Sequence, residues 1–184
     1  MFDIDKNIRS AWKGHRAFAS WLVETVNPSV IVDLGVDYGY STICFAMPSI
    51  GTVYGVDNFI GTADSGIKNT QPDVMRAIAL AGLTNIEIIK GNFDDVAKTW
   101  DKKIDILHID GLHYYSCVKN DFDTWSPFLS ENGVVLFHDV ISFAGIRKFW
   151  DEVSGNKYLF QHSAGLGVLS KDKSIIDKIK AKYG

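Results

Sequence analysis

The chain has 184 residues, of which 46% are hydrophobic and 22% are charged, so it can enclose one sizeable apolar core. This composition excludes disordered, collagen-like and coiled-coil proteins. Nineteen basic and 22 acidic side chains give a formal net charge of -3, which predicts no nucleic-acid partner.

The two cysteines, Cys44 and Cys117, are too few for a disulfide framework, and they do not form the CxxC pair of a zinc or redox site. No apolar run approaches the roughly 20 residues of a membrane span. The first residues lack the basic start and apolar block of an export signal. We therefore expect a cytoplasmic protein without a membrane partner.

Short runs rich in valine and isoleucine alternate with segments of helical spacing, which is the pattern of βαβ units around a buried parallel sheet. Apolar residues at three- and four-residue intervals predict a first helix over 11–26, which Asn27-Pro28 ends. The expected strands are 30–34, 53–56, 86–89, 104–109 and 134–137. The expected helices between them are 41–47, 73–81, 94–100 and 115–129.

The C-terminal part departs from this alternation. Residues 158–161 and 167–170 predict a hairpin that closes the sheet with an antiparallel strand, and 171–183 predict a charged amphipathic helix. The longest irregular stretch is 58–70, and a loop of this length inside a compact domain usually has a function. The fold class is α/β, in a single domain with an N-terminal helical segment, 1–28, and a core, 29–184.

The first strand runs into a turn that carries Asp33, Gly35 and Gly39. Glycine allows the backbone to approach a ligand beyond the carboxyl end of the strand. A dinucleotide fingerprint needs GxGxxG, and Asp33 and Asp37 would repel a diphosphate, so the turn favours a cationic ligand over NAD. Asp57 ends the second strand, where a carboxylate can accept both hydroxyls of a ribose. The alternative is a tight turn at the glycines and a loop cap at Asp57.

Polar residues gather where the fourth and fifth strands end. Asp110 follows the fourth strand, and His138 and Asp139 close the fifth, so the three side chains should lie close together. Two carboxylates and an imidazole can hold a divalent cation, and Mg²⁺ or Mn²⁺ suits this donor set. His113 is the expected general base, because an imidazole has a pKa near 6.5. Alternatively, Asp139 caps the following loop.

Three further polar residues have competing interpretations. His108 lies within an apolar strand, which favours a core histidine with its hydrogen bonds satisfied over a ligand. Lys13 and Arg16, in the first predicted helix, either fold over the carboxylate of a cofactor or form a solvated basic turn.

The turn from Asp33 to Gly39, followed by Asp57, resembles the first motif and the ribose-binding acid of class I S-adenosylmethionine (SAM)-dependent methyltransferases. Gly91-Asn92-Phe93-Asp94 matches the segment that edges the adenine in that family, with Asn92 where an acid is often found. The resemblance implies a Rossmann-like three-layer sandwich with a mostly parallel seven-stranded sheet. The implied cofactor-binding residues are Asp33, Gly35, Gly39, Asp57, Asn92, Phe93 and Asp110.

The pattern DGxHxYxxVxxDxxxW, which begins at Asp110, precedes a strand that ends in His138-Asp139. This combination resembles a subgroup related to macrolide-sugar O-methyltransferases and the cephalosporin-pathway methyltransferase-like protein. The resemblance implies that Asp110 and Asp139 bind Mg²⁺ and that His113 is the base, with Asp110 also catalytic. His138 stands where the related enzymes often place a carboxylate.

The expected function is metal-assisted O-methylation of a small polar substrate such as a sugar or glycoside. One alternative is a metal-independent methyltransferase in which Asp110 only orients the cofactor. Another is a catalytically silent cofactor-binding domain. The acceptor pocket is expected to come from 58–70, from the region after Asp139 and from a neighbouring subunit if the protein is a homo-oligomer.

Overall fold

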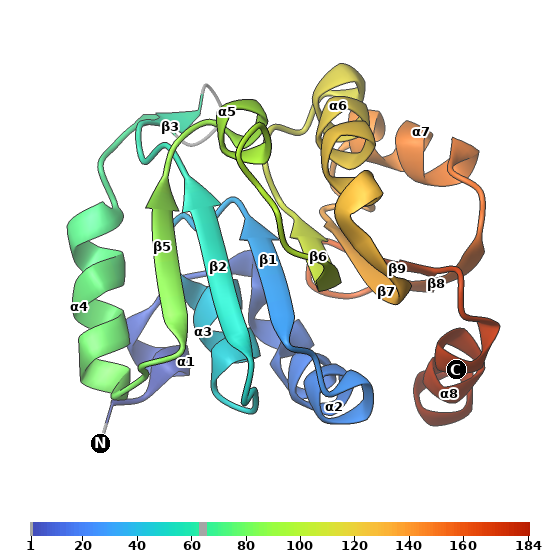
Figure 1. Ribbon diagram of the computed structural model, residues 1–184, viewed down its shortest axis with the longest axis horizontal. Helices are drawn as coiled ribbons and strands as arrows, with labels where there is room; N and C mark the ends of the chain where they lie inside the picture. Colours follow the sequence, from blue (N-terminus) through green and yellow to red (C-terminus); the bar gives the residue numbers. More distant parts are fainter. Residues whose placement is uncertain (1, 63–65) are drawn as a thin grey trace.

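A seven-stranded sheet forms the centre of the protein, as seen in a computed structural model that describes residues 2–62 and 66–184 (Figure 1). Its strands are β1 (Val30–Leu34), β2 (Thr52–Asp57), β5 (Ile86–Lys90), β6 (Ile104–Ile109), β7 (Leu129–His138), β8 (Asn156–Phe160) and β9 (Leu166–Ser170). They lie in the order β5-β2-β1-β6-β7-β9-β8, and all neighbours are parallel except where β9 pairs with β7 and β8. The expected mostly parallel sheet with an antiparallel strand near the C-terminus is confirmed.

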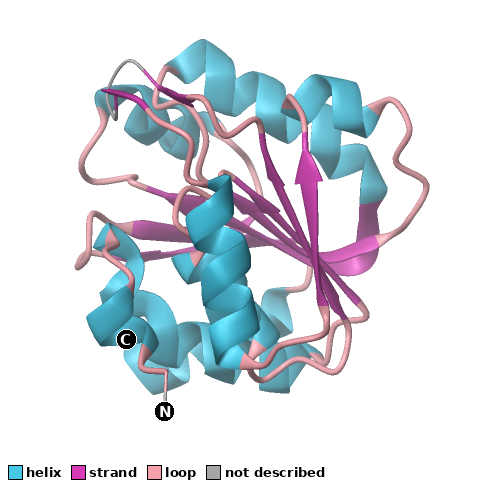
Figure 2. Cartoon of the chain, turned by 90° about the vertical axis from the view of Figure 1, so that its left-hand side faces the viewer, coloured by secondary structure: helices cyan, strands magenta, loops and turns pink. Residues whose placement is uncertain are grey.

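Helices cover both faces of the sheet and make a three-layer sandwich, as expected (Figures 1 and 2). The elements that pack on one face are α1 (Ile4–Asn7), the 3₁₀ helix η1 (Ala11–His15), α2 (Arg16–Val26), α3 (Tyr40–Ala46), α4 (Gln71–Ala81) and α8 (Lys173–Tyr183). Those on the other face are α5 (Phe93–Ala97), α6 (Tyr115–Trp125), the 3₁₀ helix η2 (Ser126–Phe128) and α7 (Ala144–Glu152). Within 2–62 and 66–184, no helix combines the length and apolar character of a membrane span.

Some element boundaries differ from the sequence predictions. The α-helix expected over 115–129 ends at Trp125, because Pro127 lacks the N–H that an α-helix interior needs and lies in η2 instead. Strand β7 begins at Leu129, earlier than the predicted 134–137. The prediction missed this start because the first four residues of the strand are partly or fully exposed and do not show the apolar pattern of a buried strand. Helices α1 and α7 were not expected.

The stretch 58–70 is not wholly irregular. Strands β3 (Gly61–Thr62) and β4 (Gly66–Ile67) pair antiparallel within it, separate from the main sheet. Gly61 and Gly66 both have positive φ angles, of 78° and 80°, which glycine adopts without a steric cost. The part of this stretch at 63–65 lies outside the described residues.

The carboxylate of Asp33 is fully buried beneath the end of β1 and is held by hydrogen bonds. It accepts from Ser41 Oγ at 2.8 Å, from Thr42 Oγ1 at 2.5 Å and from His108 Nδ1 at 2.6 Å. The other ring nitrogen, Nε2 of His108, accepts from Trp12 Nε1 at 3.1 Å. His108 is therefore a satisfied core histidine, as predicted. These bonds join β1, α3, β6 and η1 at one point.

Gly35 brings the turn after β1 against the end of β6. Its φ is 99°, and a Cβ built on it would lie 2.0 Å from the backbone oxygen of Asp110. The same two segments are joined by the N–H of Asp110, which donates to the oxygen of Leu34 at 2.8 Å. Only glycine satisfies both the positive φ and this close approach.

We predict that Gly35→Ala destabilises the protein more than Gly82→Ala does. Gly82 also has a positive φ, of 67°, but nothing lies within 4 Å of its added Cβ, so its substitution tests backbone strain alone. We expect about 1–2 kcal/mol of destabilisation for Gly82→Ala and roughly 1–3 kcal/mol more for Gly35→Ala, from the clash with Asp110. Urea unfolding measures both, and equal costs would contradict the steric explanation.

Candidate functional site

A cavity of about 730 Å³ lies at the carboxyl ends of β1, β2, β5, β6 and β7, and its volume is typical of small-molecule pockets. Most of the side chains singled out from the sequence line it. The predicted residues in its lining are Gly35, Asp57, Asn92, Phe93, Asp110, His113, His138 and Asp139. The structure thus brings the predicted cofactor residues and the predicted metal residues into one cavity.

Asp33 and Gly39 lie next to the cavity, outside its lining. All the hydrogen bonds of Asp33 described above are internal. Gly39 has a φ of 85° and is the N-cap residue directly before α3, and a Cβ on it would lie 3.3 Å from Val74. Both residues therefore support the turn after β1, and direct contact with a cofactor stays a prediction for them.

Asp57 caps its loop, which is one of the two interpretations that the sequence left open, and its role as a ribose acceptor stays a prediction. Its Oδ1 accepts from the N–H of Phe59 at 2.7 Å and its Oδ2 from the N–H of Asp37 at 3.0 Å, so it caps the loop. Because each carboxylate oxygen has two lone pairs, acceptor capacity remains toward the cavity. The neighbouring Asn58 donates through Nδ2 to Oδ1 of Asn92 at 3.2 Å, which joins the ends of β2 and β5.

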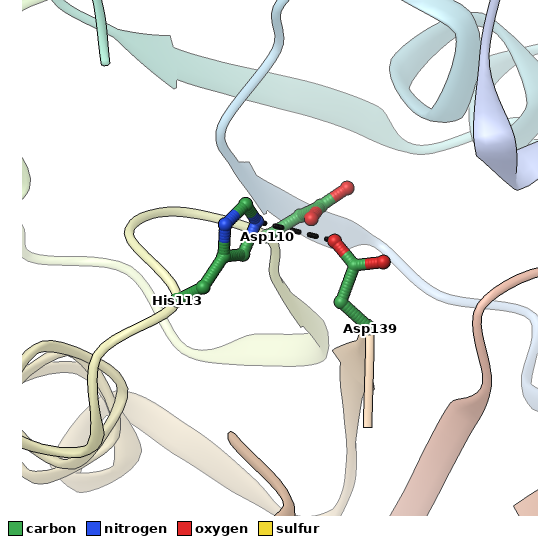
Figure 3. Close-up of side chains that lie close together, drawn as sticks. All are labelled: Asp110, His113 and Asp139. Carbon is green, nitrogen blue, oxygen red and sulfur yellow. Dashed lines mark ion pairs between the residues drawn. The ribbon is translucent and has the colours of Figure 1, made fainter. Parts of the chain in front are cut away.

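Asp110, His113 and Asp139 point toward one another from the ends of β6 and β7 and the loop after β6 (Figure 3). Each offers one ligand atom, and these atoms all lie within 4.8 Å of one another. Nε2 of His113 lies 3.1 Å from Oδ2 of Asp139. Two carboxylate oxygens and an imidazole nitrogen fit Mg²⁺ or Mn²⁺. The sequence placed His113 only as a base, whereas its position also allows ligation.

His138 lies behind this cluster and is 3% exposed. Its Nε2 donates to the backbone oxygen of Ser163 at 3.1 Å, which turns Nδ1 toward the acids. Nδ1 lies 3.4 Å from Oδ1 of Asp110 and 3.5 Å from Oδ2 of Asp139, without hydrogen-bond geometry to any described residue. A buried nitrogen aimed at two carboxylates is consistent with the predicted ligand role, which stays a prediction.

The charges in this cluster compensate one another. Burial by itself lowers the pKa of His138, but the negative charges of Asp110 and Asp139 outweigh it and raise that pKa to about 10. Burial by itself raises the pKa of Asp139, but the hydrogen bond from His113 and the nearby His138 imidazole outweigh it and hold that pKa below its ordinary value. The two carboxylates therefore require a positive charge beside them, either an imidazolium or a bound cation.

Phe143 stacks on His113, and the sequence did not indicate this contact. The ring centroids are 3.8 Å apart and the planes differ by 14°. Phe143 directly precedes α7, so the loop after β7 supplies both Asp139 and the surface on which the imidazole lies. The stacking restricts rotation of the His113 ring and favours the orientation in which Nε2 meets Asp139.

Lys13 and Arg16 do not take the cofactor-facing position that the sequence allowed. Nζ of Lys13 donates to the backbone oxygen of Asp5, and Arg16 Nη1 donates to Oδ2 of Asp5, each at 2.5 Å. Neither residue lines the cavity, whereas the cations Arg9 and Lys68 do. The basic turn is thus tied to the N-terminal segment, and α1, which the sequence analysis missed, supplies its partner.

Asp121, on α6, is a further cavity residue to which the sequence analysis gave no role. It is 7% exposed, and burial, aided by the negative charge of Asp94, raises the pKa of Asp121 to about 7. A signal for this position is nevertheless present in the spacing of the sequence. Val118, Asp121 and Trp125 are the buried residues of α6, so an acid stands within the apolar stripe of this helix.

Comparison with known proteins identifies relatives of this chain. A family model described as a methyltransferase domain matches residues 32–140. The uncharacterized protein y4gI of Sinorhizobium fredii is 33% identical over 189 residues, which cover 91% of this chain. The chain spans about a fifth of the length of that relative, 20%.

Solved structures share the fold at low sequence identity. The O-methyltransferase from Bacillus cereus in complex with SAH has a TM-score of 0.67 and 17% identity, with 85% of this chain and 80% of that chain covered. TomG from Streptomyces achromogenes, in complex with SAM, has a TM-score of 0.67 and 16% identity, with coverages of 94% and 92%. The O-methyltransferase NovP has a TM-score of 0.69 and 16% identity, with coverages of 87% and 78%.

We predict a pH-dependent stability that originates at Asp121. Its pKa is raised to about 7 in the folded protein, whereas an aspartate in an unfolded chain has a pKa of about 3.9. Because the folded state holds the proton more tightly, the free energy of unfolding should fall as the pH rises from about 4 to about 7. Asp121→Asn removes this contribution, which is no more than about 4 kcal/mol.

Urea unfolding of the unliganded protein between pH 4 and pH 8 measures this effect. Asp123→Asn is the matched control, because Asp123 is an exposed acid on the same helix and pairs with Lys119. Its profile should follow the wild type. Parallel profiles for the wild type and Asp121→Asn would contradict the prediction.

Proposed function

The chain belongs to the methyltransferase-domain family, and we propose that it transfers a methyl group from SAM to a hydroxyl of a small polar acceptor. Membership confirms the resemblance to class I SAM-dependent methyltransferases found in the sequence, and the fold agrees with O-methyltransferases of known structure. One observation carries the proposal. The cavity of about 730 Å³ holds the glycine turn, Asp57 and the Asp110–His113–Asp139 cluster together.

In this proposal the nucleoside half of the cofactor lies along the ends of β1, β2 and β5. The backbone at Gly35 permits close approach, and Asp57 accepts the ribose hydroxyls. Asn92 and Phe93 would edge the adenine. Support comes from the fold neighbours from Bacillus cereus and Streptomyces achromogenes, whose structures contain SAH and SAM. A sulfonium cation also suits a cavity lined by several carboxylates.

Asp110 and Asp139 would hold a divalent metal, with a histidine of the cluster completing the protein ligands. Bound there, Mg²⁺ or Mn²⁺ would lower the pKa of an acceptor hydroxyl and neutralise the forming alkoxide. Support comes from the mutual distances within 4.8 Å and from the demand of the two carboxylates for a compensating positive charge. An acceptor with adjacent hydroxyls, such as a sugar or glycoside, suits this arrangement.

His113 would remove the proton of the acceptor hydroxyl at Nδ1, because its Nε2–H donates to Oδ2 of Asp139. Oδ2 of Asp139, 3.1 Å from Nε2, would stabilise the imidazolium that forms. The stacked ring of Phe143 would keep the imidazole in this orientation. SAM supplies a methyl group already activated by its sulfonium, so the protein contributes mainly alignment and proton removal. An Nε2 that keeps its proton for the hydrogen bond to Asp139 has no lone pair for a metal, so the roles of His113 as base and as metal ligand exclude each other.

We predict Mg²⁺-dependent methyl transfer to vicinal diols, measured with radiolabelled SAM and a panel of sugars and glycosides. His113→Ala should lower turnover by roughly 100-fold or more, because the general base is lost. His162→Ala is the control, since that imidazole is exposed and lies outside the cavity lining. Chelation should abolish turnover, and Mg²⁺ or Mn²⁺ should restore it.

Manganese binding, followed by electron paramagnetic resonance, separates the two roles of His113. If His113 acts only as the base, His113→Ala should bind Mn²⁺ as tightly as the wild type does. Asp139→Asn should bind Mn²⁺ more weakly, because a proposed ligand is changed. Full activity after exhaustive chelation would contradict the metal role and favour a metal-independent methyltransferase. SAM binding without transfer to any acceptor would favour a catalytically silent domain, and absence of SAM binding would contradict the proposed function.

A further inference from the structure

His15 is a fully buried polar residue that the chemistry proposed above does not use. It ends η1, and burial lowers its pKa to about 3, so the imidazole is neutral and carries one N–H. Nε2 lies 3.1 Å from the backbone oxygen of Ser163, which can only accept, so this N–H is on Nε2. Nδ1 is left without a hydrogen-bond partner among the described residues.

The single hydrogen bond distinguishes His15 from an apolar residue at the same position. An apolar ring would keep the edge-to-face contacts with Trp12 and Phe160. It would also avoid the destabilising effect of a buried nitrogen without a partner. The contribution of His15 therefore lies in its Nε2 and in the carbonyl group to which that nitrogen donates.

The same carbonyl group holds His138. The Ser163 oxygen accepts from Nε2 of His138 at 3.1 Å, and its two lone pairs allow it to accept from both histidines. The centroids of the two imidazole rings are 5.8 Å apart, edge to face. Nδ1 of His138 faces Asp110 and Asp139, at 3.4 Å and 3.5 Å. His15 is therefore linked to the proposed metal site through His138.

Ser163 lies in a strained turn between β8 and β9. The φ angles of Ser163 and Ala164 are 50° and 68°, in the left-handed region that residues other than glycine rarely adopt. Such a conformation persists where surrounding contacts impose it. The N–H of Ile141 donates to the oxygen of Ala164 at 3.0 Å, and the two histidines donate to the oxygen of Ser163. The donor on His15 therefore helps to fix the oxygen that orients His138.

We propose that His15 is a positioning residue: through the Ser163 carbonyl group it orients His138 so that Nδ1 of His138 binds the divalent cation of the proposed metal site. The inference rests on the proposed function, because it requires a cation at Asp110 and Asp139. Ligating histidines commonly donate their other ring N–H to a backbone carbonyl, which fixes the orientation of the ring.

This assignment makes His138 the histidine that completes the protein ligands, and it leaves proton removal to His113. The raised pKa of His138 means that Nδ1 carries a proton while only the acids lie beside it. A bound cation would replace that proton, because an imidazole ligates through a lone pair.

Two substitutions of equal length separate the hydrogen bond of His15 from its packing. Gln places an N–H donor near the position of Nε2, whereas Met has a similar length and no donor. His15→Met should bind Mn²⁺ about 10-fold more weakly than the wild type, as expected when an outer partner of a metal ligand is lost. His15→Gln should stay within about threefold of the wild type. Electron paramagnetic resonance of the whole chain measures both affinities.

His162→Ala is the matched control and should bind Mn²⁺ as the wild type does. Its ring stacks on His15 with centroids 4.7 Å apart, but it is exposed, and its Nδ1 meets the Ser163 hydroxyl, at 3.4 Å, rather than the carbonyl group. Thermal unfolding of the unliganded proteins reports on packing. A positioning role predicts that the Gln and Met variants differ in Mn²⁺ affinity even where their melting temperatures agree.

A spectroscopic measurement needs no variant of His15 and keeps the inference testable if His15→Met does not fold. Pulsed electron paramagnetic resonance of the Mn²⁺ complex should show coupling to an imidazole nitrogen. This coupling should persist in His113→Ala, because His138 is the ligand. A Mn²⁺ complex without nitrogen coupling, or a coupling that vanishes in His113→Ala, would overturn the inference.

The affinities separate this inference from the function on which it rests. Equal Mn²⁺ affinity of the wild type and a folded His15→Met would overturn the positioning role alone. Tighter binding by His15→Met would overturn it as well, because His138 would then compete with the cation. If the wild type bound no Mn²⁺, the metal role in the proposed function would fail, and this inference with it.

Discussion

The buried carboxylate of Asp33 is the constraint on which the site depends. A fully enclosed negative charge is tolerated only where donors surround it, and here α3 supplies two hydroxyls and β6 supplies His108. His108 in turn accepts from Trp12, which places the N-terminal segment against the sheet. Losing one of these partners would cost about 1–3 kcal/mol. The bonds fix the turn after β1, the end of β6 and the segment from Arg9 to Trp12, all of which border the cavity.

Acidic side chains are concentrated in this cavity far more than the net charge suggests. The formal charge of the chain is -3, yet Asp57, Asp110, Asp121 and Asp139 all line one cavity. Their environments differ. Backbone N–H groups hold Asp57, and histidines compensate Asp110 and Asp139. Asp121, with no donor among the described residues, keeps its proton more readily. The same residue type thus occupies three different electrostatic environments within one cavity.

The sequence was sufficient to predict the features that depend on periodicity along one strand and on the common edge at which parallel strands end. These include the strand ends, the glycine turn and the meeting of Asp110 with Asp139. Other features depend on how helices and loops rotate onto the sheet, which local pattern does not encode. The stacking of Phe143 on His113 and the entry of Asp121 into the cavity are of this kind. Helix α7 was missed because its exposed charged residues obscure three buried apolar ones.

The most direct test of the account is a crystal structure of the chain with SAH and Mn²⁺, recorded at a wavelength where manganese scatters anomalously. The account predicts one anomalous peak bonded to carboxylate oxygens of Asp110 and Asp139. It also predicts SAH in the same cavity, with its ribose hydroxyls on Asp57. SAH bound elsewhere, or SAH in the cavity while manganese avoids both carboxylates, would contradict the account.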